Sequence, residues 1–449
     1  MRKFLTKLTE YGFYLFVFLL PWQTRWIWRT AHLNGKVWEY GSGSLYGTDI
    51  LLVFLIFLGI FLPRQNKKTC LRPLWAVIGA FFLVCFASVL WSQDKGISWY
   101  VIVRLAEIIG LFWLVRRIDF SWPKLGVAIA SAGVVQGVFG IYQFFSQHII
   151  ANKWLGLAAH QPGQLGDSVI ATVEGRYLRA YGAFPHPNVL GGFLVICLFI
   201  LIGFLFTLYT DRKANLGKIL LTVFSLIIVS YGLILTFSRS AWLAFGIAFM
   251  CLLAISVWHR HRYRLILLTE VASWLIILVL MTVALVPDIW VTRLEATAPL
   301  EQQSIEQRAD YYVQARDLVI SHWYQGVGLG DYTGALYDRD TTRAAWDYQP
   351  VHNIFVLAAA ETGIFGGLLF MAIAIQFFQL ALRQSRREFS KHNWLIMWAI
   401  VFIAILLLGL SDHYIWTLPS GMFLYWLALG AWAKRYDQIA CGQDQGGSP

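Results

Sequence analysis

The chain has 449 residues, of which 58% are hydrophobic and only 14% are charged. Soluble domains carry roughly 25% charged residues, so this composition excludes a chain of soluble domains and indicates a polytopic membrane protein. The formal net charge is +11. In a membrane protein, an excess of Lys and Arg marks loops retained in the cytoplasm. Because there is no basic soluble domain, we expect no nucleic-acid partner.

Twelve apolar stretches predict transmembrane helices. Lys and Arg concentrate in the N-terminal segment, in alternate short loops and near the C-terminus, which places both termini in the cytoplasm. The sequence therefore predicts an all-α polytopic fold with one transmembrane domain over residues 1–449 and a cytoplasmic tail over residues 434–449. The predicted spans are approximately 5–21, 48–63, 73–91, 97–115, 124–145, 189–209, 218–237, 241–258, 265–287, 353–381, 394–410 and 418–433.

This topology places three long loops on the exported side, at residues 22–47, 146–188 and 288–352. The last loop, between spans nine and ten, is the longest. It contains a helix-like stretch, SIEQRADYYVQARDLVISHW, followed by a glycine-rich turn, QGVGLGDYTG. Long loops with structure of their own commonly carry function. The cytoplasmic loops are short, and the chain lacks the GxxxxGK[ST] motif, so we expect the chemistry on the exported side.

Three arginines in the exported regions are candidate anion-binding residues. Arg239, in LTFSRSAWLAF, stands between two apolar stretches, where its guanidinium could bind phosphate or simply meet lipid headgroups. Arg308, in SIEQRADYYVQARDL, is a second candidate, with a solvated surface residue as the alternative. Arg316 is a weaker, supporting candidate because the adjacent Asp317 offers an ordinary partner.

Four polar residues at the edges of spans or inside them are the other candidates. His352 opens the tenth span, and a helix N-terminus favours the neutral imidazole that can accept a proton. The alternative is an interfacial anchor. Glu361, in the same apolar span, is either a functional residue or a residue that holds neighbouring helices together. Asn188, in FPHPNVL, either caps the next helix or supports the site. Asp412, beside His413, is an additional supporting candidate.

The sequence predicts neither a metal site nor a cofactor. It contains no HExxH motif, and the exported carboxylates form no cluster with nearby histidines in the sequence. We therefore expect any anion to be neutralised by arginine rather than by a divalent ion.

Taken in order along the chain, these motifs resemble the O-antigen ligase and polymerase family of bacterial envelope enzymes. Four stretches carry the resemblance: AFPHPNVLGGF, FSRSAWLAF, EQRADYYVQARDLVISHWYQGVGLGDY and HNIFVLAAAETGIFGG. They occupy residues 183–193, 237–245, 306–332 and 352–367. The resemblance implies a GT-C-like glycosyltransferase of the inner membrane, with its active site facing the periplasm and membrane lipids around it.

The resemblance also implies roles for individual residues. The donor would be a glycan on undecaprenyl diphosphate, with Arg239 and Arg308 binding the diphosphate and His352 acting as the base. Transfer would invert the anomeric centre without a metal. The expected acceptor is a lipid A-core sugar. A second lipid-linked glycan, as in a polymerase, or a protein hydroxyl are the alternatives.

A different class of function is transport, either of a lipid-linked glycan or of a small anion. A transporter needs polar residues through the middle of the bilayer and access from both faces. In this sequence most of the notable polar residues gather near the exported face. The distribution therefore favours an enzyme.

Overall fold

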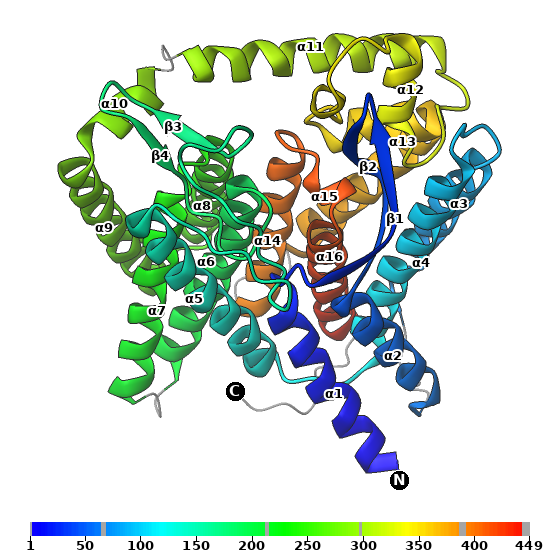
Figure 1. The fold of residues 1–449 in the computed structure, drawn as a ribbon. Coiled ribbons are helices and arrows are strands. Elements are labelled where there is room, and N and C mark those ends of the chain that lie inside the picture. The colour runs from blue at the N-terminus through cyan, green and yellow to red at the C-terminus, as the bar shows by residue number, and fades with distance from the viewer. Residues whose placement is uncertain (1, 64–68, 212–214, 296–298, 386–391, 442–449) are drawn as a thin grey trace.

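The computed structural model describes residues 2–63, 69–211, 215–295, 299–385 and 392–441 (Figure 1). These residues are mostly helical, and seven of their helices are long and apolar enough to cross a membrane. The seven are α4 (Lys95–Arg117), α5 (Trp122–Ser146), α6 (Pro187–Thr210), α7 (Leu216–Leu235), α8 (Arg239–Trp258), α9 (Arg262–Leu285) and α13 (Ile354–Ser385).

The other five predicted spans also coincide with helices among the described residues. These are α1 (Arg2–Leu19), α2 (Gly47–Phe61), α3 (Arg72–Ser88), α14 (Asn393–Gly409) and α16 (Pro419–Ala440). Helices α2, α3 and α14 have 15, 17 and 17 residues. At a rise of about 1.5 Å per residue they reach at most about 26 Å, somewhat less than a bilayer core of about 30 Å. The number of twelve crossings therefore stays a prediction.

The core is centred on α6, which is buried along most of its length, and α14 and α16 are similarly enclosed. Helices α7, α8 and α9 instead expose many large apolar side chains, including Phe224, Leu243 and Leu280. Exposed apolar faces on helices of spanning length are suited to contact lipid. The buried helices and the exposed ones thus divide the bundle into an interior and a lipid-facing rim.

The predicted long loop folds into helices. It contains α10 (Pro287–Glu295), α11 (Pro299–Ser321), α12 (Tyr332–Arg339) and a 3₁₀ turn (Ala345–Asp347). In Figure 1, α11 crosses one end of the bundle, whereas the start of α1 and the end of α16 lie at the other end. The expected helix over SIEQRADYYVQARDLVISHW is confirmed as α11.

The first residues of the predicted cytoplasmic tail are helical. Residues 434–440 are the last turns of α16. Lys434 is buried there, and its Nζ donates to the carbonyls of Val115 and Ile118 at the end of α4. The free carbonyls at that helix end thus gain a donor. Residues 442–449 of the predicted tail lie outside the described residues.

The expectation of an all-α fold was incomplete, because the described chain contains two antiparallel β-hairpins. Strand β1 (Arg25–Leu33) pairs with β2 (Lys36–Tyr46), and β3 (Val169–Ala171) pairs with β4 (Arg176–Leu178). The first hairpin turns at Asn34 and Gly35, whose φ angles are 48° and 75°. Asn-Gly is the preferred pair for a two-residue turn with two positive φ angles. The turn of this hairpin could therefore have been predicted from the sequence.

Helix α13 is broken at Gly363, where φ is 72°. The glycine-rich turn after α11 packs backbone to backbone against this break. The Val327 N–H donates to the Ala360 carbonyl (2.9 Å), and the Ile364 N–H donates to the carbonyl of Trp323 (2.8 Å). A Cβ on Gly363 would lie 2.2 Å from a backbone carbonyl oxygen, so only glycine fits. These contacts fix the long loop against the helix that begins just after His352.

Candidate functional site

A cavity of about 1190 Å³ is lined mostly by segments that the sequence analysis predicts to be exported. Its walls come from β2, α4, the segments around β3 and β4, α8, α10, α11, the residues before α6 and α13, and α15 (Tyr414–Thr417). Six of the seven predicted site residues line this cavity: Asn188, Arg239, Arg308, His352, Glu361 and Asp412. The structure thus gathers residues that are far apart in the sequence.

One end of the cavity is rich in arginine. Arg239 begins α8, and its Nη2 lies 2.9 Å from Glu301 Oε2. Arg293 binds the other oxygen of the same carboxylate and donates from Nε to the Phe237 carbonyl (2.9 Å). Arg308, two turns further along α11 than Glu301, has no hydrogen bond or ion pair with another described residue. Its guanidinium therefore remains available to an anion.

Arg179 is a cavity-lining residue that the sequence analysis missed. It is buried, and its three nitrogens donate to the Thr236 carbonyl (2.7 Å), Ser168 Oγ (2.7 Å) and Asn188 Oδ1 (2.9 Å). Burial, followed by the nearby Arg293, lowers the pKa of Arg179 to about 9. This guanidinium still carries its charge at neutral pH.

We call this region the arginine end, and it comprises Arg176, Arg179, Arg239, Arg293 and Arg308. Arg239 and Arg293 share the carboxylate of Glu301, which leaves a net positive charge. Arg179 and Arg293 could have been sought in the sequence, because arginines in loops predicted to be exported run against the usual charge bias. Clustered guanidinium groups are suited to bind phosphate.

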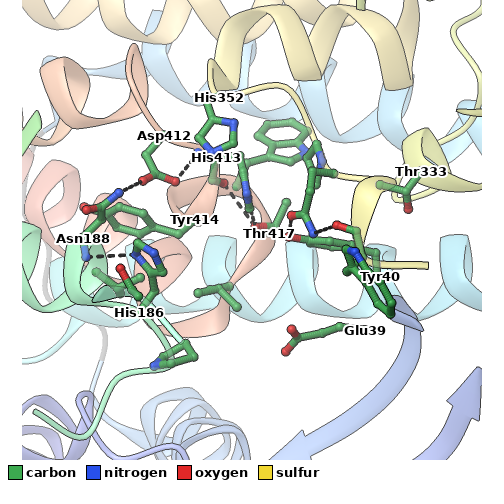
Figure 2. A pocket seen from close by; sticks show the side chains of 18 of the residues that line it. Glu39, Tyr40, His186, Asn188, Thr333, His352, Asp412, His413, Tyr414 and Thr417 are labelled. Carbon is green, nitrogen blue, oxygen red and sulfur yellow. Dashed lines mark hydrogen bonds between the residues drawn. The ribbon is translucent and has the colours of Figure 1, made fainter. Parts of the chain in front are cut away.

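Next to the arginine end, His352 lies in a cluster of aromatic and polar side chains (Figure 2). Its ring stacks parallel to Tyr311, with centroids 5.7 Å apart, and meets His413 edge to face at 5.0 Å. The buried Asp412 accepts hydrogen bonds from Asn188 Nδ2 (3.0 Å) and from the backbone N–H of His413 (2.8 Å). Asn188 therefore connects Asp412 with Arg179 at the arginine end.

The protonation states in this cluster favour a neutral base. Burial lowers the pKa of His352, Asp412 opposes this effect, and Arg308 reinforces it. Burial also lowers the pKa of His413 to about 4 and that of His186 to about 3. Burial pushes the pKa of Asp412 upward, but the positive charge that His413, His352 and His186 carry when protonated, together with the hydrogen bond from Asn188, outweighs it and keeps the pKa below its usual value. At neutral pH the cluster therefore holds neutral imidazoles and one carboxylate.

The two remaining candidates, Glu361 and Arg316, differ in whether they line the cavity. Glu361 is buried in the cavity wall and accepts a hydrogen bond from Trp416 Nε1 (2.9 Å). Arg316 is exposed and pairs with Asp317 at 2.8 Å. It does not line the cavity, so the structure does not bring this predicted supporting residue to the site.

The structure brings His352 to Asp412 and His413, which are neighbours in the sequence. The ligand-type atoms of His352, Asp412 and His413 all lie within 4.8 Å of one another, a spacing that a metal ion could use. The chain brings them together by packing the segment before α13 against the start of α15. A second such group, Cys70, Asp437 and Cys441, includes two cysteines that are joined in a disulfide.

Comparison with known families supports the resemblance found in the sequence. Residues 223–371 match the family model described as O-antigen ligase. This segment belongs to the O-antigen ligase family. It contains three of the four resembling stretches and includes Arg239, Arg308 and His352, whereas residues 183–193 lie outside it. No curated protein matches the chain.

The O-antigen ligase match covers about a third of the chain. Together with the seven apolar helices, it indicates a multi-pass membrane protein with a glycosyltransferase activity of the ligase or polymerase type. The O-antigen ligase family also implies lipid-linked glycans and lipid A-core as general partners.

Proposed function

We propose that this protein transfers a glycan from undecaprenyl diphosphate to a hydroxyl of a lipid A-core sugar. The reaction takes place at the periplasmic face of the inner membrane. One observation carries the proposal: a cluster of arginines and a neutral histidine beside a carboxylate line the same cavity. These are the groups that a departing diphosphate and an attacking hydroxyl require.

The arginine end suits the diphosphate of the donor. Arg308 has no partner among the described residues, and Arg239 and Arg293 share the carboxylate of Glu301. A bound diphosphate brings negative charge that these three guanidinium groups can bind in addition to Glu301. As the bond to the sugar breaks, negative charge grows on the leaving diphosphate, where fixed cations stabilise the transition state most.

His352 acts as the general base in this mechanism. The acceptor hydroxyl oxygen attacks the anomeric carbon, and its proton passes to an imidazole nitrogen of His352. The bond between the anomeric carbon and the phosphate oxygen breaks, and its electron pair leaves with the lipid diphosphate. Asp412 stabilises the imidazolium that forms. A direct displacement of this kind inverts the anomeric configuration.

The hydrogen bonds of the cluster favour a base over a metal site. Both oxygens of Asp412 already accept hydrogen bonds, and Nδ1 of His413 lies 2.9 Å from Thr417 Oγ1. Arginines can neutralise the diphosphate without a divalent ion. We therefore propose a metal-independent and cofactor-independent transfer.

Product analysis tests this function. Purified protein in liposomes is incubated with lipid-linked glycan and lipid A-core, and the products are identified by mass spectrometry. We expect glycan attached to lipid A-core and release of undecaprenyl diphosphate. Elongation of the lipid-linked glycan alone would assign the polymerase reaction, and glycan on a protein hydroxyl would assign a protein transferase. Absence of every transfer product would contradict the proposed function.

A further inference from the structure

The cavity has a second end, which is formed by the β1–β2 hairpin. We call it the hairpin end. In Figure 2, Glu39 and Tyr40 lie on one side of His352 and His413, and Asn188 and His186 lie on the other side. The hairpin lies outside the segment that matches the O-antigen ligase family. It supplies Glu39, Tyr40, Ser42, Ser44 and Tyr46 from β2, with Arg25 from β1.

The hairpin is held as a fixed wall of the cavity. Tyr40 donates to Gln349 Oε1 (2.7 Å), in the segment that leads to His352. Tyr100, on α4, donates to the Ser44 carbonyl (2.8 Å). At the tip, Asn34 Nδ2 donates to two carbonyls of the loop after α12. These bonds join the hairpin to both flanks of the cavity, so its side chains hold a defined position.

The hairpin end lies directly against the proposed base cluster. The Tyr40 ring meets the His413 ring edge to face, with centroids 5.9 Å apart. His413 in turn contacts the His352 ring. A molecule bound at the hairpin end is therefore separated from His352 by the His413 ring, and it lies on the side away from Asn188 (Figure 2).

The chemistry of this end differs from that of the arginine end. Its charges are paired: Arg25 lies 3.4 Å from Glu39, whose side chain remains 58% exposed. Trp346 also lines the cavity and is exposed, so its ring offers an open apolar face. Hydroxyl, amide and carboxylate groups beside an exposed aromatic ring match the hydroxyls and an apolar ring face of a sugar. They do not match a multiply charged anion.

We propose that the hairpin end binds the acceptor glycan. Glu39 accepts hydrogen bonds from sugar hydroxyls, and Trp346 packs against a ring face, so that the attacking hydroxyl points to His352. The ligand is a hydroxyl-rich sugar carried either by lipid A-core or by a second lipid diphosphate. This assignment rests on the proposed transfer reaction, and it names the surface on which the acceptor is selected.

Steady-state transfer kinetics test the assignment with Glu39→Gln and Trp346→Ala. Each assay varies one substrate, with lipid A-core and lipid-linked glycan tested separately as acceptors. We expect the acceptor KM to rise about tenfold or more for each variant, as for the loss of one charged hydrogen bond or one packed ring. The donor KM should stay unchanged. The acceptor whose KM responds identifies the source of the sugar.

Val37→Ala is the matched control, because Val37 is exposed on the same strand and does not line the cavity. It should leave both KM values unchanged, and thermal unfolding should show that all variants fold. An unchanged acceptor KM in both variants, or an equal rise in the donor KM, would overturn the assignment while wild-type transfer persists. Absence of product from the wild-type protein with either acceptor would contradict the transfer reaction itself, and the assignment with it.

Discussion

The two ends of the cavity differ in how far their arginines are balanced by carboxylates. At the arginine end, Arg239 and Arg293 share the carboxylate of Glu301, and Arg308 lacks a partner among the described residues. At the hairpin end, Arg25 is matched by Glu39. A leaving diphosphate requires fixed positive charge, whereas an uncharged hydroxyl requires hydrogen bonds and a base. The difference indicates that one cavity can hold two chemically distinct substrates on either side of His352.

The largest effect is expected where the two ends meet. His352→Ala should reduce the transfer rate by about 10²–10⁴-fold, the usual contribution of a general base. Binding of undecaprenyl diphosphate should persist, because the arginine end is unchanged. His148→Ala, a change at an exposed histidine that does not line the cavity, should have no effect. Full activity of His352→Ala in a single-turnover assay would remove the base from the mechanism.

The next largest effect on the transfer rate is expected for the arginines of the arginine end, compared with an arginine on the surface. Arg239→Ala and Arg308→Ala should each lower the transfer rate by about 10²–10³-fold, as for the loss of one group that stabilises a developing anion. Arg316→Ala provides the control on the same helix as Arg308, because Arg316 pairs with Asp317 outside the cavity. Equal transfer rates for Arg308→Ala and Arg316→Ala would contradict the proposal that Arg308, unlike Arg316, binds the diphosphate.

A smaller effect concerns the pH dependence of the base. Burial keeps the pKa of His352 below its usual value, so the neutral imidazole persists at neutral pH and activity should fall only in acid. The anionic Asp412 raises this pKa. Asp412→Asn should therefore move the acid limb of kcat/KM for the acceptor to lower pH, and it should also reduce the rate above that limb. An acid limb that moves to higher pH would contradict this role of Asp412.

The smallest effect is expected for metal removal. If His352, Asp412 and His413 act as a base cluster, EDTA should leave the transfer rate unchanged. Loss of activity with EDTA, followed by recovery with one divalent ion, would instead make the three residues a metal site.

The sequence indicated two of the five residues of the arginine end. Arg239 stands between two apolar stretches, and Arg308 lies in the helix-like part of the longest loop. The sequence could not predict that Arg179 would reach the same end, since this depends on packing against the Thr236 carbonyl and Asn188. The sequence offers Arg316 only as a supporting candidate, and the structure leaves it outside the cavity. Arg316 is turned about 80° around the helix axis from Arg308, assuming 3.6 residues per turn.

The hairpin end was missed for a different reason. Its Asn34-Gly35 turn and β-forming residues are visible in the sequence, but no motif in this loop connects it with the site. Its place beside His352 depends on long-range bonds such as that from Tyr40 to Gln349. No local pattern encodes such a contact. The helices, by contrast, follow from apolar stretches that are continuous in the sequence.

The affinity for undecaprenyl diphosphate tests most directly whether the arginine end holds the donor. It can be measured with the purified wild-type protein, Arg308→Ala and Arg316→Ala in identical detergent. The account predicts that Kd rises at least about tenfold for Arg308→Ala, as for the loss of a charged hydrogen bond, and stays at the wild-type value for Arg316→Ala. Equal affinities for all three proteins would contradict the assignment of this end to the lipid diphosphate.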